Sequence, residues 1–526
     1  MTELALGVAG LAAGIPGLVQ VIGTLGKTLL QRVEHSGDQY HKELELVIRT
    51  TKSQAQEICL HLHGLGQSVP ESLKDDILQI FQALRSTFER LIRLVPATNQ
   101  AAEKPKLSAA TKAKIDFEVR AIEDWNTRMF HRAMIFVNFG QQKTAGTAQL
   151  RDLPDEYRAV ALKKVEKLRE SVGESLEKAK DESNLLLIHS EEQKEQTICV
   201  ALPNSSLELR RSNIDDTSVL VEYLTYSDSA LEREIRSQRR IVREVARILR
   251  RADPEFMGLL YCDGFLWDSL KCRFELHFPI PSGLQDPRTL LDLLTDSSTR
   301  RFGIKHPLNQ RIALAKSIVM AVFVLHSASL VHKQIRPDNV VIFENSPLPT
   351  GTQRDTPERQ RYPYVLGKPF LVGFDNVRNV DAASLLLPVE DWKKNIYLSP
   401  RRQRLQQGDE FQMEDDMYSV GVVLIEIAFW ASFQDKSAAQ LGKLVWQDAS
   451  QSALKGPEQL KKTYISLAAG AVPRKMGQKY ADIVMACLTG LESEQGDLKR
   501  LEDEDGIVVG TRYMVEVISK LEEIIM

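Results

Sequence analysis

The stretch that decides the fold runs Leu325-His326-Ser327-Ala328-Ser329-Leu330-Val331-His332-Lys333-Gln334-Ile335-Arg336-Pro337-Asp338-Asn339-Val340-Val341. Helical patterns dominate from Leu308 onward, and strand-like runs follow near 340–343 and 370–372. The polar part of the stretch is therefore predicted to join a helix to a strand. Loops in that position commonly carry functional side chains.

The residues before this stretch have a different texture. Runs rich in β-branched and aromatic residues predict strands at 197–202, 219–224, 257–261 and 273–279. A charged helix is predicted at 230–251. We therefore expect a small strand-rich part at about 197–283 and a larger helical part at about 284–526. The insert at 344–364, rich in proline and arginine, is predicted to be a surface loop.

Residues 1–190 show helical periodicity throughout. Apolar side chains recur at intervals of three and four along five segments, which begin near residues 4, 40, 73, 115 and 154. A polar junction at 181–196 separates them from the strand-rich part. The predicted fold class is therefore multidomain: an N-terminal all-α helical bundle at 1–190, followed by an α+β domain at 191–526.

The composition sets the broad class of protein. The chain has 526 residues, of which 43% are hydrophobic and 26% charged, as is usual for soluble globular domains. A formal net charge of -3 gives no global attraction to nucleic acid, and no such partner is expected. The five cysteines lack metal-binding spacing, which indicates free thiols, a reducing compartment and no metal site. Glu3 precedes the first apolar run, so no signal peptide is predicted.

The 325–341 stretch resembles the catalytic loop of protein kinases, in which His-Arg-Asp-Leu-Lys-Pro-x-Asn follows a helix ending in Leu-His. His332 and Asn339 keep the family's spacing. The family's base is an aspartate that accepts or orients the proton of the substrate hydroxyl. Gln334 replaces it, and an amide accepts no proton at neutral pH. Arg336 keeps the positive charge of the family's lysine, and Asn339 could ligate a metal or hydrogen-bond the backbone.

A second motif lies at 370–376, which reads Phe-Leu-Val-Gly-Phe-Asp-Asn where the family has Asp-Phe-Gly. On this resemblance Gly373 replaces the carboxylate that holds the metal, and glycine offers no ligand. Phe374 keeps the aromatic packing position. Asp375 comes two residues late, where a shifted metal contact is disfavoured.

A third resemblance places Glu222 at the phosphate-binding lysine. The run Val-Leu-Val-Glu at 219–222 resembles the family's third strand, Val-Ala-Ile-Lys. A carboxylate repels phosphate by about 4 kcal/mol per unit charge pair at 4 Å and an effective dielectric constant of 20. No glycine occurs at 202–213, so the usual backbone cradle for phosphates is missing. The charged helix offers Glu234 or Glu244 as the former partner of that lysine.

The resemblance continues downstream and covers about 197–525. Tyr-Leu-Ser-Pro-Arg at 397–401 resembles the Ala-Pro-Glu element, with Arg401 in place of glutamate. Asp416 opens a run similar to Asp-x-Trp-Ser-x-Gly, and its implied role is to brace the catalytic-loop backbone. The implied fold is bilobal and kinase-like. The residues with an implied structural role are His332, Arg336, Asn339, Phe374 and Asp416.

Loss of the base, the metal carboxylate and the phosphate lysine together leaves little electrostatic stabilisation for phosphoryl transfer. The degenerate positions Gln334, Gly373 and Glu222 therefore predict a pseudokinase with no catalytic residue and no required cofactor. ATP binding stays open but is disfavoured. An atypical active kinase is the weakest alternative.

The first predicted helix, residues 4–29, is apolar and rich in glycine. Gly10 and Gly14 form a small-xxx-small pair that would let another helix approach closely. Two hypotheses follow: a core helix of the bundle, or a helix that is released and inserts into a membrane. The candidate membrane or oligomer residues are Gly10, Leu11, Gly14, Ile15, Leu18 and Ile22.

Such a first helix at the head of a bundle resembles the fungal HeLo and HeLo-like domains. Its pairing with an inactive kinase fold is similar in plan to the mixed-lineage kinase domain-like protein of animals. The resemblance implies a regulated cell-death or heterokaryon-incompatibility effector, controlled by an upstream signalling protein, that forms homo-oligomers and binds membrane lipids. It implies a cytoplasmic chain that moves to the plasma membrane on activation. The alternative is a signalling scaffold that dimerises through the bundle and has no lipid affinity.

Overall fold

The computed structural model describes residues 20–29, 31, 47–52, 54, 55, 58, 71–95, 109–139, 197–212, 217–296, 306–327, 330–346, 362–374, 378–379, 391–404, 412–435, 441–447, 453–490 and 514–524. The chain divides into two compact units, 1–163 and 164–526, and each is described by itself. The predicted domain boundary near residue 190 lies outside the described residues.

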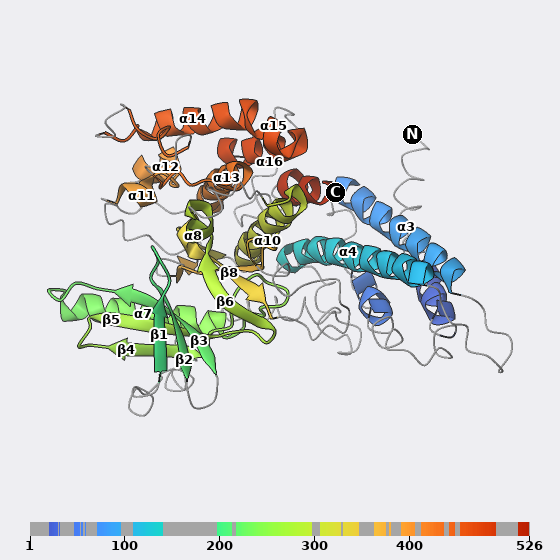
Figure 1. Cartoon of the computed structure of the whole chain (residues 1–526), viewed down its shortest axis with the longest axis horizontal. Helices are drawn as coiled ribbons and strands as arrows, with labels where there is room; N and C mark the ends of the chain where they lie inside the picture. The colour runs from blue at the N-terminus through green and yellow to red at the C-terminus, as the bar shows by residue number, and fades with distance from the viewer. Residues whose placement is uncertain are drawn as a thin grey trace. The chain divides into compact units, whose positions relative to one another are not determined.

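Two long helices make up most of the described part of the first unit. They are α3, Glu71–Leu94, and α4, Ala109–Phe139, which lie side by side (Figure 1). Arg90 pairs with Glu118 at 2.9 Å and Arg132 pairs with Asp76 at 2.6 Å, so the helices run antiparallel. The buried side of α3 carries apolar residues at helical spacing, namely Ile77, Ile80, Phe81, Leu84, Phe88 and Leu91.

Parts of two further helices are described in this unit. Residues 20–29 are helical and bury Ile22 and Leu29, and the described helical residues between 47 and 58 bury Val47, Ile48, Ala55 and Ile58. A Cβ atom built at Gly26 would lie 2.7 Å from Cγ2 of Ile48, so the two segments approach closely there. The described residues of this unit contain no strand, in agreement with the predicted helical bundle. The predicted helix after Pro154 lies outside them.

The second unit begins with an antiparallel five-stranded sheet in the order β1-β2-β3-β5-β4. Register places Glu222 of β3 between Leu207 of β2 and Leu276 of β5. The helix α7, Glu232–Leu249, packs against β4 and β5. The strands are β1 Thr197–Ala201, β2 Leu207–Ser212, β3 Ser218–Thr225, β4 Gly264–Asp268 and β5 Arg273–Pro279.

Two smaller antiparallel sheets follow. The first has the order β6-β8-β9 and includes the predicted pair of runs, since Val341 of β8 lies opposite Phe370 of β9. The second joins two short strands, β7 and β10. Their bounds are β6 Leu284–Thr289, β7 Leu330–Val331, β8 Val340–Asn345, β9 Lys368–Leu371 and β10 Arg378–Asn379.

The rest of the unit is helical, built around α13, Met413–Phe429, which is buried along most of its length. It packs against α10, Leu308–Ser327, and α16, Gln478–Thr489 (Figure 1). By length and composition α10 could cross a membrane, but its buried side chains make it a core helix of this unit. The other elements are α8 Leu290–Thr295, the 3-10 turn η6 Pro337–Asn339, α11 Trp392–Asn395, α12 Pro400–Arg404, α14 Pro457–Gly470, α15 Val472–Met476, the π-helical η10 Met514–Ser519 and α18 Lys520–Glu522.

The strand predicted at 257–261 is wrong. Only Leu259 makes an isolated bridge there, to Leu371. Gly258 has φ of +63°, and a Cβ at this position would lie 2.9 Å from the Cβ of Ala321. The left-handed glycine breaks the extended path, while Met257, Leu259 and Leu260 stay fully buried. The apolar run is therefore a buried connection and not a strand.

Candidate functional site

Glu222 of β3 is 1% exposed and binds the backbone of a distant segment. Its Oε2 accepts a hydrogen bond from the N–H of Gly373 at 3.1 Å, and its Oε1 accepts one from the N–H of Phe374 at 2.9 Å. A buried carboxylate is costly without such donors, and hydrogen bonds to an ionised acceptor are among the stronger ones. Glu222 therefore ties β3 to the segment that the sequence aligns with the Asp-Phe-Gly motif. The two glutamates suggested as the former partners of the family's lysine have other contacts: Glu234 accepts the N–H of Leu231, and Glu244 pairs with Arg247.

Gly373 has no room for a side chain. Its φ is +88°, and a Cβ atom built there would lie 2.2 Å from Cγ of Asn339. The Asn339 side chain is itself held, because its Nδ2 donates to the carbonyl of Gln334 at 2.8 Å. An aspartate at position 373 would collide with Asn339. The arrangement around Gly373 therefore excludes a metal-holding carboxylate at this position.

Asp416 of α13 braces the loop that follows β7. Its Oδ2 accepts the N–H of His332 at 2.7 Å, and its Oδ1 accepts the N–H of Lys333 at 2.8 Å. The ring of His326 lies 3.1 Å from Oδ2, and Asp416 is fully buried. Lys333 has φ of +69°, a strained conformation for a residue with a Cβ. The two bonds from Asp416 hold the loop in this shape, which is the role that the sequence implied for it.

His332 is a buried, neutral histidine in this loop. Its Nε2 lies 2.9 Å from the carbonyl of Val372, and its Nδ1 accepts the N–H of Gln334 at 3.3 Å. A carbonyl only accepts, so the proton is assigned to Nε2. Burial lowers the pKa of His332 to about 4, against a smaller opposing effect of Asp416. The ring of Phe374 packs edge-on against it, with 5.3 Å between centroids. His332 and Phe374 thus form a packed contact across the site.

Arg336 and Asn339 are engaged within the chain. Arg336 pairs with Asp338 at 3.2 Å. Of the two roles left open for Asn339, the geometry fits a hydrogen bond to the backbone. Among the described residues no group of three or more histidine, cysteine, aspartate or glutamate side chains is placed to hold a metal ion. Asp375 lies outside the described residues.

A polar cavity of about 370 Å³ opens beside this loop. It is lined by the β1–β2 turn, by η6 with the preceding Arg336, by the start of α11, and by Gln434. Sequence reasoning missed its lysines, although the adjacent pair Lys393 and Lys394 was a visible signal. The lining residues are Asn204, Ser205, Ser206, Arg336, Asp338, Asn339, Asp391, Lys393, Lys394 and Gln434.

The Arg401 position shows an ion pair that the sequence left unassigned. Arg401 pairs with Asp415, which is buried at the start of α13. The other Asp415 oxygen accepts the hydroxyl of Ser399 at 2.5 Å. The partner of the arginine is thus an acid one residue before Asp416. This contact fastens the 397–401 segment to α13.

Of the six candidate membrane or oligomer residues, Ile22 lies within the described residues. Ile22 is 2% exposed, as a core residue would be. Gly10, Leu11, Gly14, Ile15 and Leu18 lie outside the described residues.

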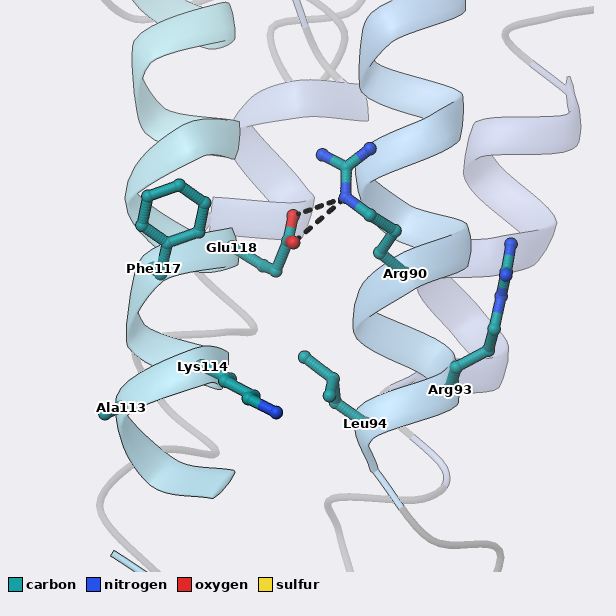
Figure 2. A pocket seen from close by; sticks show the side chains of 7 residues that line it. All are labelled: Arg90, Arg93, Leu94, Ala113, Lys114, Phe117 and Glu118. Carbon is teal, nitrogen blue, oxygen red and sulfur yellow. Dashed lines mark hydrogen bonds and ion pairs between the residues drawn. The ribbon is translucent and has the colours of Figure 1, made fainter. Parts of the chain in front are cut away.

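The first unit also has a pocket of about 400 Å³ between α3 and α4 (Figure 2). Arg90 reaches across it, with its Nε 2.9 and 3.0 Å from the two carboxylate oxygens of Glu118. Arg93 and Lys114 also line the pocket, giving three cations against one acid. Phe117 lies at its edge and is 70% exposed. The pocket therefore combines positive charge with an exposed aromatic ring.

Comparison with known proteins adds a structural neighbour only. No protein-family model matches the chain, and no curated protein matches it. Among solved structures, it is similar to a chain of the crystal structure of the yeast RNA Pol II CTD kinase CTDK-1 complex, with a TM-score of 0.35 and 12% identity over 57% of this chain and 89% of that chain. At this score the chain has a kinase-like structural neighbour, and no function follows from it.

Proposed function

We propose that residues 191–526 form a bilobal kinase-like domain that does not transfer phosphate and instead acts as a regulatory domain. The observation that carries this proposal is the pair of hydrogen bonds from Gly373 and Phe374 to the buried carboxylate of Glu222. The carboxylate stands where the kinase resemblance requires a phosphate-binding lysine. A triphosphate brought to it would meet repulsion of about 4 kcal/mol per unit charge pair at 4 Å and a dielectric constant of 20.

Two further contacts support the same proposal. The space beside Gly373 is filled by Asn339, so the metal-holding carboxylate has no place. Gln334 stands at the base position, and its backbone carbonyl accepts a hydrogen bond from the side-chain amide of Asn339. Phosphoryl transfer depends on electrostatic stabilisation and positioning. In the family, the residues that Glu222, Gly373 and Gln334 replace each supply part of it.

The direct test is transfer of radiolabelled phosphate from Mg-ATP to a generic protein substrate and to the chain itself. We expect no transfer by the purified full chain. Contaminating kinases are the main artefact, so Glu222→Ala and Gln334→Ala serve as controls. Transfer that either substitution abolishes would contradict the proposal, whereas transfer that both variants retain would come from a contaminant.

For the first unit we propose a membrane-active role in regulated cell death or incompatibility, restrained by the kinase-like domain until a signal arrives. On activation the chain would leave the cytoplasm for the plasma membrane, form homo-oligomers and bind lipid. This proposal is supported by the apolar, glycine-rich sequence at 4–29 and by the exposed Phe117 beside Arg93 and Lys114. Exposed aromatic rings with cations suit the surface of an anionic bilayer.

Dye leakage from anionic liposomes tests this role, with the full chain and with residues 1–190. We expect leakage by 1–190 and loss of leakage in Leu18→Asp. Phe117→Ser is the matched surface variant, because a side chain that is 70% exposed can be replaced without unfolding the unit. Circular dichroism of each variant separates loss of activity from loss of fold. A folded, inert 1–190 would count against a membrane-active unit.

A scaffold that dimerises through the helical unit is the second candidate. Burial of Ile22 and Leu29, and the close approach of Gly26 to Ile48, favour a first helix that stays in the core. Sedimentation analysis distinguishes the two. A stable soluble dimer that neither binds nor permeabilises liposomes would support the scaffold.

A further inference from the structure

We infer that the polar cavity beside η6 binds a phosphate monoester dianion. Three cationic side chains line it, Arg336, Lys393 and Lys394, against two acids. The surplus of positive charge indicates an anionic ligand. This site goes beyond the regulatory and membrane roles proposed above and does not depend on either.

Both acids of the cavity are already engaged. The Oδ2 atom of Asp338 forms an ion pair with Arg336 at 3.2 Å, and its Oδ1 atom accepts a hydrogen bond from the side-chain amide of Gln434 at 3.3 Å. Asp391 accepts the backbone N–H of Lys393 on Oδ1 at 3.0 Å. Their negative charge is therefore partly compensated by groups inside the chain.

The cations have donors to spare. Within the described part of the chain, neither the Lys393 nor the Lys394 ammonium has an ion-pair partner. The Nε–H of Arg336 is buried and lacks an acceptor among the described residues. A guanidinium with an open N–H and two nearby ammonium groups suits a compact, doubly charged oxyanion, because charge-assisted hydrogen bonds are the strong ones.

The opposite wall of the cavity is small and polar. It is the β1–β2 turn, in which Asn204 takes the left-handed conformation with φ of 55°. Ser205 and Ser206 follow. The Ser205 hydroxyl donates to the carbonyl of Leu202 at 3.0 Å, so Ser206 supplies the hydroxyl that suits a phosphate oxygen. A volume of about 370 Å³ lies within the range of small-ligand sites, so part of the carrier of the phosphate enters with it.

The inner side of the site limits which phosphate ligands fit. Glu222 fixes the backbone at Gly373 and Phe374, and Asn339 fills the space beside Gly373. A further phosphate extending inward would approach a buried carboxylate. A single terminal phosphate, on a phosphorylated side chain or on a small metabolite, avoids that contact.

Calorimetric titration of the purified full chain tests the inference with phenyl phosphate and phenyl sulfate, which share a shape but differ by one charge at neutral pH. We expect phenyl phosphate to bind about tenfold or more tightly than phenyl sulfate. The second pKa of a phosphate monoester is about 6. No histidine lines the cavity, whose ionisable groups are Arg336, Asp338, Asp391, Lys393 and Lys394, so affinity should rise from pH 5.5 to 7.5 with the ligand's own titration.

The double variant Lys393→Gln/Lys394→Gln should weaken phenyl phosphate about tenfold or more. Its matched control is Lys461→Gln/Lys462→Gln, an adjacent lysine pair on α14 away from the cavity, which should leave the affinity within about twofold. Equal affinity for sulfate and phosphate, equal effects of the two variants, or no binding of phenyl phosphate at millimolar concentration would each overturn the inference.

Two further ligands identify the natural source of the phosphate. A phosphoserine peptide that binds more tightly than phenyl phosphate, and whose binding Lys393→Gln/Lys394→Gln weakens, assigns the site to a phosphorylated protein segment. Glucose 6-phosphate that binds more tightly, with the same dependence on the lysine pair, assigns it to a small metabolite. Both results support the monoester site, and binding of either ligand that ignores the lysine pair counts against it.

Discussion

Two buried carboxyl groups of the second unit, Glu222 and Glu426, have different hydrogen-bond partners. Glu222 accepts hydrogen bonds from two backbone amides that lie 151 and 152 residues further along the chain. Glu426 of α13 accepts, on Oε1, the Tyr397 hydroxyl at 2.8 Å, the Ser432 hydroxyl at 2.8 Å and the Phe433 N–H at 2.7 Å. Burial nevertheless raises the pKa of Glu426 to about 8, so this group holds its proton at neutral pH.

Removing the Glu222 carboxylate should destabilise the fold, because two buried N–H groups lose their acceptor. We expect Glu222→Ala to lower the free energy of unfolding by roughly 2–5 kcal/mol. Thr225→Ala, at the exposed end of the same strand, is the control and should change it by less than about 0.5 kcal/mol. Urea unfolding of both variants provides the measurement. Equal, small effects would mean that the Glu222 contact contributes little.

Glu426 gives the unit a pH dependence of a definite sign. Its folded pKa of about 8 lies above the ordinary value of 4.5, so the folded state keeps a proton that the unfolded state loses. Its contribution to stability is complete below about pH 4.5 and is lost as pH rises to about 8. We expect Glu426→Gln to remove this fall, so the variant should gain stability relative to wild type between pH 5 and 8. If urea unfolding gave the same difference in unfolding free energy between Glu426→Gln and wild type at every pH from 5 to 8, the raised pKa of Glu426 would be contradicted.

At the scale of elements, close approach at glycine decides how several segments meet. Gly421 of α13 faces α16, where a Cβ would lie 2.9 Å from the Cβ of Cys487. A Cβ built at Gly373 would lie 2.2 Å from Cγ of Asn339. At Gly283 and Gly470, by contrast, a built Cβ would have no atom within 4 Å, so these glycines serve as matched controls.

Gly373→Ala and Gly283→Ala separate backbone strain from collision. Both positions have positive φ, +88° and +79°, but only Gly373 has a neighbour within reach of a Cβ. Each alanine should cost about 1–2 kcal/mol for the left-handed backbone. Gly373→Ala should cost roughly 1–3 kcal/mol more, since Asn339 must move. If chemical denaturation gave equal losses of unfolding free energy for the two variants, the Asn339 side chain would move aside at no cost.

The contact between α13 and α16 can be tested in the same way. Gly421→Ala should lower the free energy of unfolding by about 1–3 kcal/mol, because it inserts a methyl group into a packed helix interface. Gly470→Ala, near the end of α14 with nothing within 4 Å, should leave it unchanged or raise it by up to about 1 kcal/mol. Thermal unfolding of the two variants in opposite directions is the expected result. A tolerated Gly421→Ala would contradict the close approach.

Strands rich in β-branched or aromatic residues could be predicted from the sequence, and a strand with a charged, proline-containing sequence could not. The β5, β8 and β9 strands were predicted, and the structure confirms them. The β6 strand was missed because it reads Leu-Gln-Asp-Pro-Arg-Thr and is irregular between Gln285 and Arg288. The 257–261 run was wrong because burial alone does not separate a strand from a buried connection.

For the whole unit, spacing within one segment was easier to predict than contact between segments. The positions of Gln334 and Asn339 followed from one short motif, whereas the contacts of Asp416 with the loop, 83 and 84 residues away, were implied only by the family resemblance. The bond between Glu222 and Gly373 spans 151 residues, and no local pattern specifies it. The cavity with Lys393 and Lys394 escaped notice for the same reason, since its lining comes from four separate segments.

Hydrogen bonds and packing contacts in the second unit fix the backbone around Glu222, Gly373 and Asp416. Asp416, His332 and Phe374 pack as a continuous buried group, so the loop keeps its shape. Glu222 accepts the N–H of Gly373, and the Asn339 side chain fills the space beside that glycine. These contacts are the basis on which we propose a regulatory role for the second unit.

The most direct test is calorimetric titration of the purified full chain with ATP in the presence and absence of magnesium. With Glu222 bound to the Gly373 and Phe374 amides, we expect no saturable binding at up to millimolar nucleotide and no effect of magnesium. Saturable binding of Mg-ATP at micromolar concentration would contradict the inactive cleft.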